Sequence, residues 1–93
     1  MSILERFIKQ PSDVQDYDID FTEWLAALSD TGSSASAVAE TGITIDSSSL
    51  ADGVVKVWVS GGVNGSRYKV TITLTTTGGR VKEVEIVIRV KET

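Results

Sequence analysis

Alternation of apolar and polar residues is the strongest pattern in the chain, and it predicts β-strands. Over residues 68–75 every second side chain is apolar, and lysine or threonine fills the positions between. The same period recurs over residues 84–91, after a Gly78-Gly79 pair that suits a hairpin turn. A period of two places alternate side chains on opposite faces of a sheet. We therefore expect two adjacent strands with these inner residues: Tyr68, Val70, Ile72, Leu74, Val84, Ile86, Ile88 and Val90.

Other patterns predict further strands earlier in the chain, and the strongest of these covers residues 54–60. Residues 54–60 are rich in valine and carry Trp58, residues 33–40 suit a weak strand, and residues 43–45 suit a short one. The Asp-Ser-Ser-Ser run at 46–49 suggests a turn. Short strands at spacings of roughly ten residues, with turn signals between them, are typical of a sandwich or a small barrel.

Tyr68 stands just after the glycine-rich loop 61–65, at the start of its strand. This position suits a tyrosine corner, in which the hydroxyl bonds to backbone upstream, and it suits an ordinary strand aromatic equally well.

The stretch from Tyr17 to Leu28 fits two patterns. Alternation with Asp18 predicts a strand ending near Phe21, after which the apolar residues fall at helical spacing. Asp20 and Glu23 have the spacing of a capping box. We expect a strand to Phe21, followed by a helical turn or a bulged continuation of the strand.

The first residues differ from the rest of the chain. Ile3, Leu4, Phe7 and Ile8 have the spacing of one helical face, and Pro11 interrupts that pattern. A short apolar stripe needs the domain or a neighbouring subunit to cover it. The prediction is an all-β, Ig-like β-sandwich with an extended N-terminal arm, the arm being residues 1–16 and the domain residues 17–93.

Composition narrows the chemistry that is open to the chain. The 93 residues are enough for one domain and contain neither cysteine nor histidine. This excludes disulfides, thiolate catalysis, cysteine zinc sites and any nucleophile paired with histidine. An apolar fraction of 41% suits a globular domain, and no apolar run approaches the length of a membrane span.

Charge is distributed unevenly along the chain. The net charge is −4, with ten acidic and two basic residues up to position 53, and seven basic and three acidic residues after it. The two halves can attract one another within one chain or between copies. The overall sign and the absence of a basic cluster with interleaved aromatics argue against nucleic acid as a partner. The first residues lack a basic region leading into an apolar one, so we expect no secretory signal.

Candidate chemistry is sparse. Asp16, Asp18 and Asp20 could wrap a calcium ion, but Phe21 stands where an EF-hand needs glycine, so a solvated strand face is the preferred interpretation. A small hydrolase using Asp18, Asp20 or Asp46 would need a cleft that nothing here builds. We therefore expect no catalytic residue, no cofactor and no resident metal.

Three segments together resemble the phage fibre–tail adaptor proteins, small Ig-like virion components of tailed phages. They are Lys9-Gln-Pro-Ser-Asp-Val-Gln-Asp-Tyr-Asp-Ile-Asp-Phe-Thr-Glu-Trp-Leu, Val55-Lys-Val-Trp-Val-Ser-Gly-Gly-Val-Asn-Gly-Ser-Arg-Tyr-Lys-Val-Thr, and Thr75-Thr-Thr-Gly-Gly-Arg with the strand after it. The resemblance implies a non-enzymatic structural protein of the virion, at the neck or tail, that links fibres to the particle in symmetric copies. Its implied partners are other virion proteins and further copies of itself, with neither membrane nor nucleic acid.

Partner-binding residues follow from the pattern and not from the resemblance. We expect the arm to dock on a neighbour through a set of apolar anchors: Ile3, Leu4, Phe7, Ile8 and Tyr17. The alternative is a free-standing Ig-like module that binds carbohydrate or a host surface through Trp58 and Tyr68, if these are exposed. A buried Trp58 would favour the adaptor.

Overall fold

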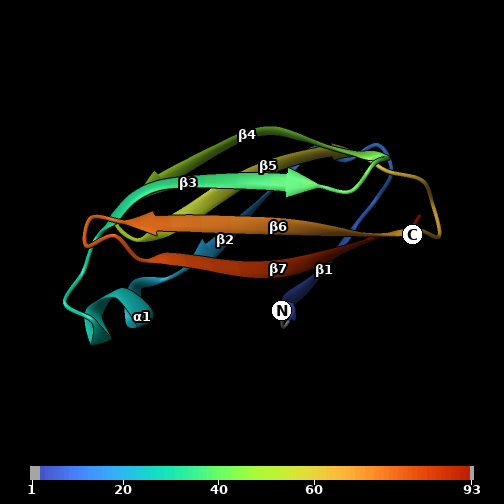
Figure 1. Ribbon diagram of the computed structural model, residues 1–93. Helices are drawn as coiled ribbons and strands as arrows, with labels where there is room; N and C mark the ends of the chain where they lie inside the picture. The colour runs from blue at the N-terminus through green and yellow to red at the C-terminus, as the bar shows by residue number, and fades with distance from the viewer. Residues whose placement is uncertain (1–2, 93) are drawn as a thin grey trace.

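The computed structural model describes the backbone of residues 3–92 and the side chains of residues 5–92. In this part of the chain strands predominate, and they form two packed sheets (Figure 1). The elements are β1 (Ile3–Lys9), β2 (Gln15–Asp20), α1 (Thr22–Ala27), β3 (Gly32–Ala39), β4 (Ile43–Ala51), β5 (Val54–Gly61), β6 (Arg67–Thr76) and β7 (Val81–Val90).

The strand order confirms the all-β sandwich. One sheet runs β1-β7-β6-β3 and the other runs β2-β5-β4. This partition is Ig-like except for the first strand, which pairs with the last strand and so belongs to the sheet of β7, β6 and β3. β1 runs parallel to β7, whereas every other pairing is antiparallel. A parallel neighbour needs a long connection, and β1 and β7 lie at opposite ends of the chain.

The core lies between the two sheets and is built from the predicted inner rows. Val70, Ile72, Ile86 and Ile88 are completely buried. The facing sheet contributes three valines of β5, at every second position, that are equally buried: Val55, Val57 and Val59. Burial of these rows removes apolar surface from water, which is the main stabilising contribution of a sandwich.

The segment after β2 is helical. Leu25 of α1 turns into the core, and Phe21 precedes the helix. The expected capping box is absent, since Phe21 occupies the cap position without a side-chain bond. Asp20 instead accepts a hydrogen bond from the Thr22 amide at 2.8 Å. The first turn therefore has a local acceptor for one of its free amides. No helix in residues 3–92 is both long enough and apolar enough to cross a membrane.

Two further sequence expectations were wrong. Residues 3–9 form a strand and not a helix, so Phe7 faces inward and Ile8 faces outward. The physical reason is that β1 satisfies the backbone groups along the free edge of β7. Residues 46–49 lie within β4 and not in a turn, with an irregular register between Ile45 and Ser47. There the main-chain pairing with β5 prevails over the turn preference of serine.

The extended arm is not seen as a separate segment. β1 pairs with β7 from Ile3 to Lys9, and the short link 10–14 leads directly to β2. The division into an arm over 1–16 and a domain over 17–93 stays a prediction.

Candidate functional site

The anchors expected at the N-terminus do not share one surface. The side chains of Ile3 and Leu4 lie outside the described residues. Ile8 is 67% exposed on the outer face of β1. Phe7 and Tyr17 instead meet inside the sandwich, with ring centroids 4.3 Å apart. Of the described anchors, only Ile8 is presented to a partner by this chain alone.

Tyr17 carries a buried hydroxyl that has no hydrogen-bond partner within residues 5–92. Burial raises the pKa of this phenol above its ordinary value, and the charges of Asp13 and Asp16 add to the effect. The hydroxyl therefore stays protonated and contributes no bond to the isolated chain.

Lys9 is the last residue of β1, and its side chain links this strand to the other sheet. Its side chain is almost completely buried, and Nζ donates to three backbone carbonyls, those of Gln10 (2.7 Å), Pro11 (3.3 Å) and Gly61 (2.6 Å). Burial lowers the pKa of Lys9, and the nearby charge of Asp13 opposes that shift. The ammonium ties the end of β1 to the end of β5 in the other sheet.

The aspartates at alternate positions of β2 have partners other than a metal ion. Lys56 Nζ lies 3.0 Å from Asp16 Oδ2 and 3.5 Å from Asp18 Oδ1. Its hydrogen bond holds the pKa of Asp16 below the ordinary value. In the described residues no group of three or more acidic side chains is placed to hold a metal ion. The side chains of Asp16 and Asp18 are 37% and 55% exposed on this face of β2.

The residues of the alternative binding module divide between surface and core. Trp58 is 40% exposed on the outer face of β5, so this side chain meets the condition set for a surface-binding module. Tyr68 is only 8% exposed, and its hydroxyl bonds to the Val63 amide upstream. The tyrosine-corner interpretation is therefore confirmed.

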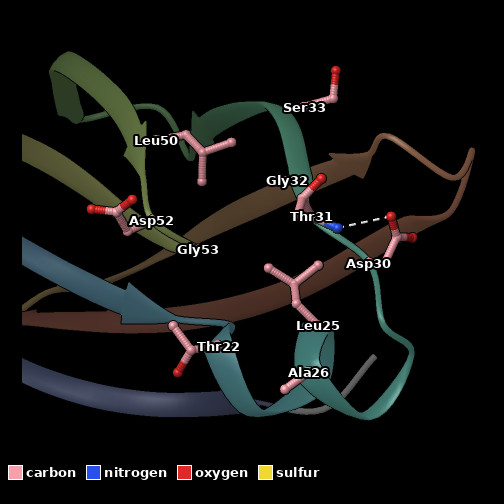
Figure 2. A pocket seen from close by; sticks show the side chains of 10 residues that line it. All are labelled: Thr22, Leu25, Ala26, Asp30, Thr31, Gly32, Ser33, Leu50, Asp52 and Gly53. Atoms are coloured by element: carbon pink, nitrogen blue, oxygen red, sulfur yellow. Dashed lines mark hydrogen bonds between the residues drawn. The ribbon is translucent and has the colours of Figure 1, made fainter.

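An open groove of about 490 Å³ lies between α1, the start of β3 and the β4–β5 turn (Figure 2). Leu25 and Leu50 point into it, and Asp30 and Asp52 lie at its rim. The Asp30 carboxylate is held by an ion pair and by hydrogen bonds. It lies 2.8 Å from Arg80 Nη1 and accepts the Thr31 and Gly78 amides.

Hydrogen bonding fixes the ionisation of Asp30. The Thr76 hydroxyl, the Thr31 amide, the Arg80 guanidinium and the Gly78 amide together lower its pKa to about 2. A group this acidic stays charged at neutral pH and is a poor general acid. The groove therefore presents apolar surface beside a carboxylate whose charge is already paired with Arg80.

A second hollow, of about 250 Å³, lies on the outer face of the four-stranded sheet. Arg6, Arg67, Lys69 and one acidic residue, Glu40, surround it, and Tyr68 and Val87 complete its lining. The sequence analysis did not identify this cluster, because it depends on the register that brings β1, β7 and β6 side by side. The available signal in the sequence was that Arg67 and Lys69 occupy outward-facing positions of the alternating strand.

The comparisons with known proteins identify the family. A search of the curated proteins found no match to the chain. A family model described as "Podophage GP4 fiber-tail adaptor protein gp77" matches residues 9–89. The match begins at the last residue of β1 and ends within β7, so it spans nearly the whole sandwich. The chain therefore belongs to the gp77 family of podophage fibre-tail adaptor proteins and is a structural component of a phage virion.

Proposed function

We propose that this protein connects fibre subunits to the neck or tail of the particle through protein–protein contacts, in several symmetric copies. The observation that carries the proposal is the family match over residues 9–89. The closely packed core supports it, because a connector under load needs a body that keeps its shape.

One contact is proposed for residues 1–16, through Ile3, Leu4, Phe7, Ile8 and Tyr17. Ile8 is already exposed for such a contact. Phe7 and Tyr17 become available only if β1 leaves its own sheet and pairs with the β7 edge of a neighbour. Exchange of a terminal strand between identical subunits keeps every contact of the strand and adds a link between copies.

Removal of the gene from the phage that encodes it tests the adaptor function. We expect tailed particles without fibres, seen by negative-stain electron microscopy, and fibres restored when the gene is supplied in trans. Antibody labelling of complemented particles should mark the neck or tail. Fibres that remain on particles lacking the protein would refute the proposal.

Substitution of Ile8 tests the contact of the N-terminal segment. Ile8→Ser changes an exposed side chain, so the free energy of unfolding should change by at most about 0.5 kcal/mol. Complementation by this variant should yield fewer fibres per particle. Val63→Ser is the matched control, since Val63 is equally exposed and lies in the β5–β6 loop. Equal fibre numbers for both variants would remove Ile8 from the contact.

The exposure of Trp58 favours a second candidate, a module that binds carbohydrate or a host surface. In that case a glycan should shift the fluorescence of Trp58, and Trp58→Thr should abolish the shift. No shift with any surface glycan of the host would leave the adaptor as the proposed function.

A further inference from the structure

The second hollow, which we call the basic hollow, carries more positive charges than the carboxylates near it can neutralise. Three basic residues, Arg6, Arg67 and Lys69, and one acidic residue, Glu40, line it. Glu40 accepts a hydrogen bond from the Lys69 amide, and Arg89 of β7 adds a further positive charge on the neighbouring strand. Arg67 and Arg89 stand directly opposite one another on β6 and β7. Like charges at directly opposed positions destabilise a sheet. In residues 5–92 no carboxylate lies within ion-pair distance of Arg6, Arg67 or Arg89, and Lys69 reaches Glu85 only at 4.0 Å.

The size of the hollow indicates a single inserted side chain. Its volume of about 250 Å³ lies below the roughly 300–1,000 Å³ that is usual for small-molecule pockets. Val87 supplies apolar lining, and Ile8, 67% exposed, stands beside Arg89 in the register of β1 and β7. A hollow with an apolar lining and a guanidinium rim suits an aromatic ring with negative charge around it.

The opposite side of the same molecule carries such a group. Trp58, on the outer face of β5, lies between Asp16 of β2 and Ser47 of β4 in the register of the three-stranded sheet. Lys56 is the one basic residue that β2, β4 and β5 contribute to this face. Four aspartates share this face with Trp58: Asp16, Asp18, Asp20 and Asp46.

We propose that the chain self-associates head to tail, with Trp58 of one copy inserted into the basic hollow of the next. The arginines would lie against the indole and the aspartates around it, which combines cation–π contact with opposite charges. This inference rests on the proposed adaptor function and names one of its partners as a second copy of the chain.

A second copy is favoured because both complementary surfaces belong to one chain and face opposite ways. The acidic face and the basic hollow occupy the outer sides of different sheets. An interface between two different surfaces leaves one of each free, so further copies add until a ring closes or a filament grows. A connector that repeats around a tail axis needs an interface of this type.

Two variants separate this arrangement from every other mode of association. Arg67→Glu/Arg89→Glu removes the hollow and keeps Trp58, whereas Trp58→Thr removes the indole and keeps the hollow. Sedimentation velocity of the purified full chain should show self-association that weakens with salt. Each variant alone should associate roughly 30-fold more weakly, as expected for an interface hot spot.

An equimolar mixture of the two variants is the decisive measurement. It retains one intact hollow and one intact Trp58, so it should form one-to-one dimers and no larger species. Circular dichroism and urea unfolding check that each variant is folded. A monomeric wild-type chain at millimolar concentration, a variant that self-associates as strongly as wild type, or a mixture without dimers would each overturn the inference. Fibre loss on gene removal would still support the adaptor function in those cases.

Discussion

The Tyr68 hydroxyl accepts a hydrogen bond from the Val63 amide, with 3.0 Å between oxygen and nitrogen. The bond joins the loop after β5 to the start of β6, five residues later. The ring lies so close to Gly42 that a Cβ there would stand 2.8 Å from Tyr68 Cε1. Gly42 also has a φ of +112°, which favours glycine. The corner therefore depends on the ring, its hydroxyl and this glycine together.

Tyr68→Phe should lower the free energy of unfolding by about 1–1.5 kcal/mol, because the Val63 amide loses its acceptor and the ring stays in place. Urea unfolding followed by circular dichroism measures the change. An unaltered midpoint would mean that water replaces the hydroxyl without cost.

Tyr17→Phe should leave stability unchanged or increase it by up to about 1 kcal/mol. The Tyr17 hydroxyl is buried without a partner in residues 5–92. Its removal therefore relieves the free-energy cost of burying a polar group that makes no hydrogen bond. The two substitutions are chemically identical and provide each other's control. A loss equal to that of Tyr68→Phe would show that the Tyr17 hydroxyl does have a partner.

Much of the fold was predictable because strong alternation needs no knowledge of distant partners. β6 and β7 lie where the period of two predicted them, and Tyr68 lies where a corner tyrosine belongs. The helical alternative after Phe21 was also correct, since Leu25 packs into the core from α1.

The remaining errors share one cause, which is that sequence patterns do not show free sheet edges. Ile3–Lys9 becomes a strand because β7 offers an unpaired edge, and the serines of β4 pair because β5 does. The basic hollow was out of reach for the same reason. Arg67 and Arg89 are 22 positions apart in sequence, and only the register of β6 and β7 places them opposite one another.

Asp30→Asn should destabilise the protein at neutral pH and have little effect in strong acid. The native carboxylate has a pKa of about 2, below its ordinary value of 3.8, so the unfolded chain binds more protons between these values. Its stabilising contribution is therefore complete above about pH 4 to 5 and is lost as the pH falls towards 2.

Urea midpoints of wild type and Asp30→Asn, measured from pH 7 to pH 2, check this behaviour. The gap between the two proteins should be widest at pH 7 and should narrow steadily below pH 4. Asp46→Asn provides the matched control, because the Asp46 carboxylate accepts only a Ser60 hydroxyl on the exposed surface. A gap that stays constant with pH would show that the amide disturbs packing and not charge.

Lys9→Met should lower the free energy of unfolding by roughly 1–3 kcal/mol, because methionine fills the space but leaves carbonyl oxygens without a donor. The Gly61 carbonyl at 2.6 Å loses the most direct bond between β1 and β5. Hydrogen exchange should therefore accelerate in β1 more than in β6, which lies inside its sheet. Lys56→Met removes a lysine whose side chain is 42% exposed, so it should lower the free energy of unfolding less than Lys9→Met does, with no preference for β1. If Lys9→Met and Lys56→Met behave alike, Lys9 does not hold β1 in place, and the contact between Phe7 and Tyr17 is what the N-terminal segment must give up to reach a neighbour.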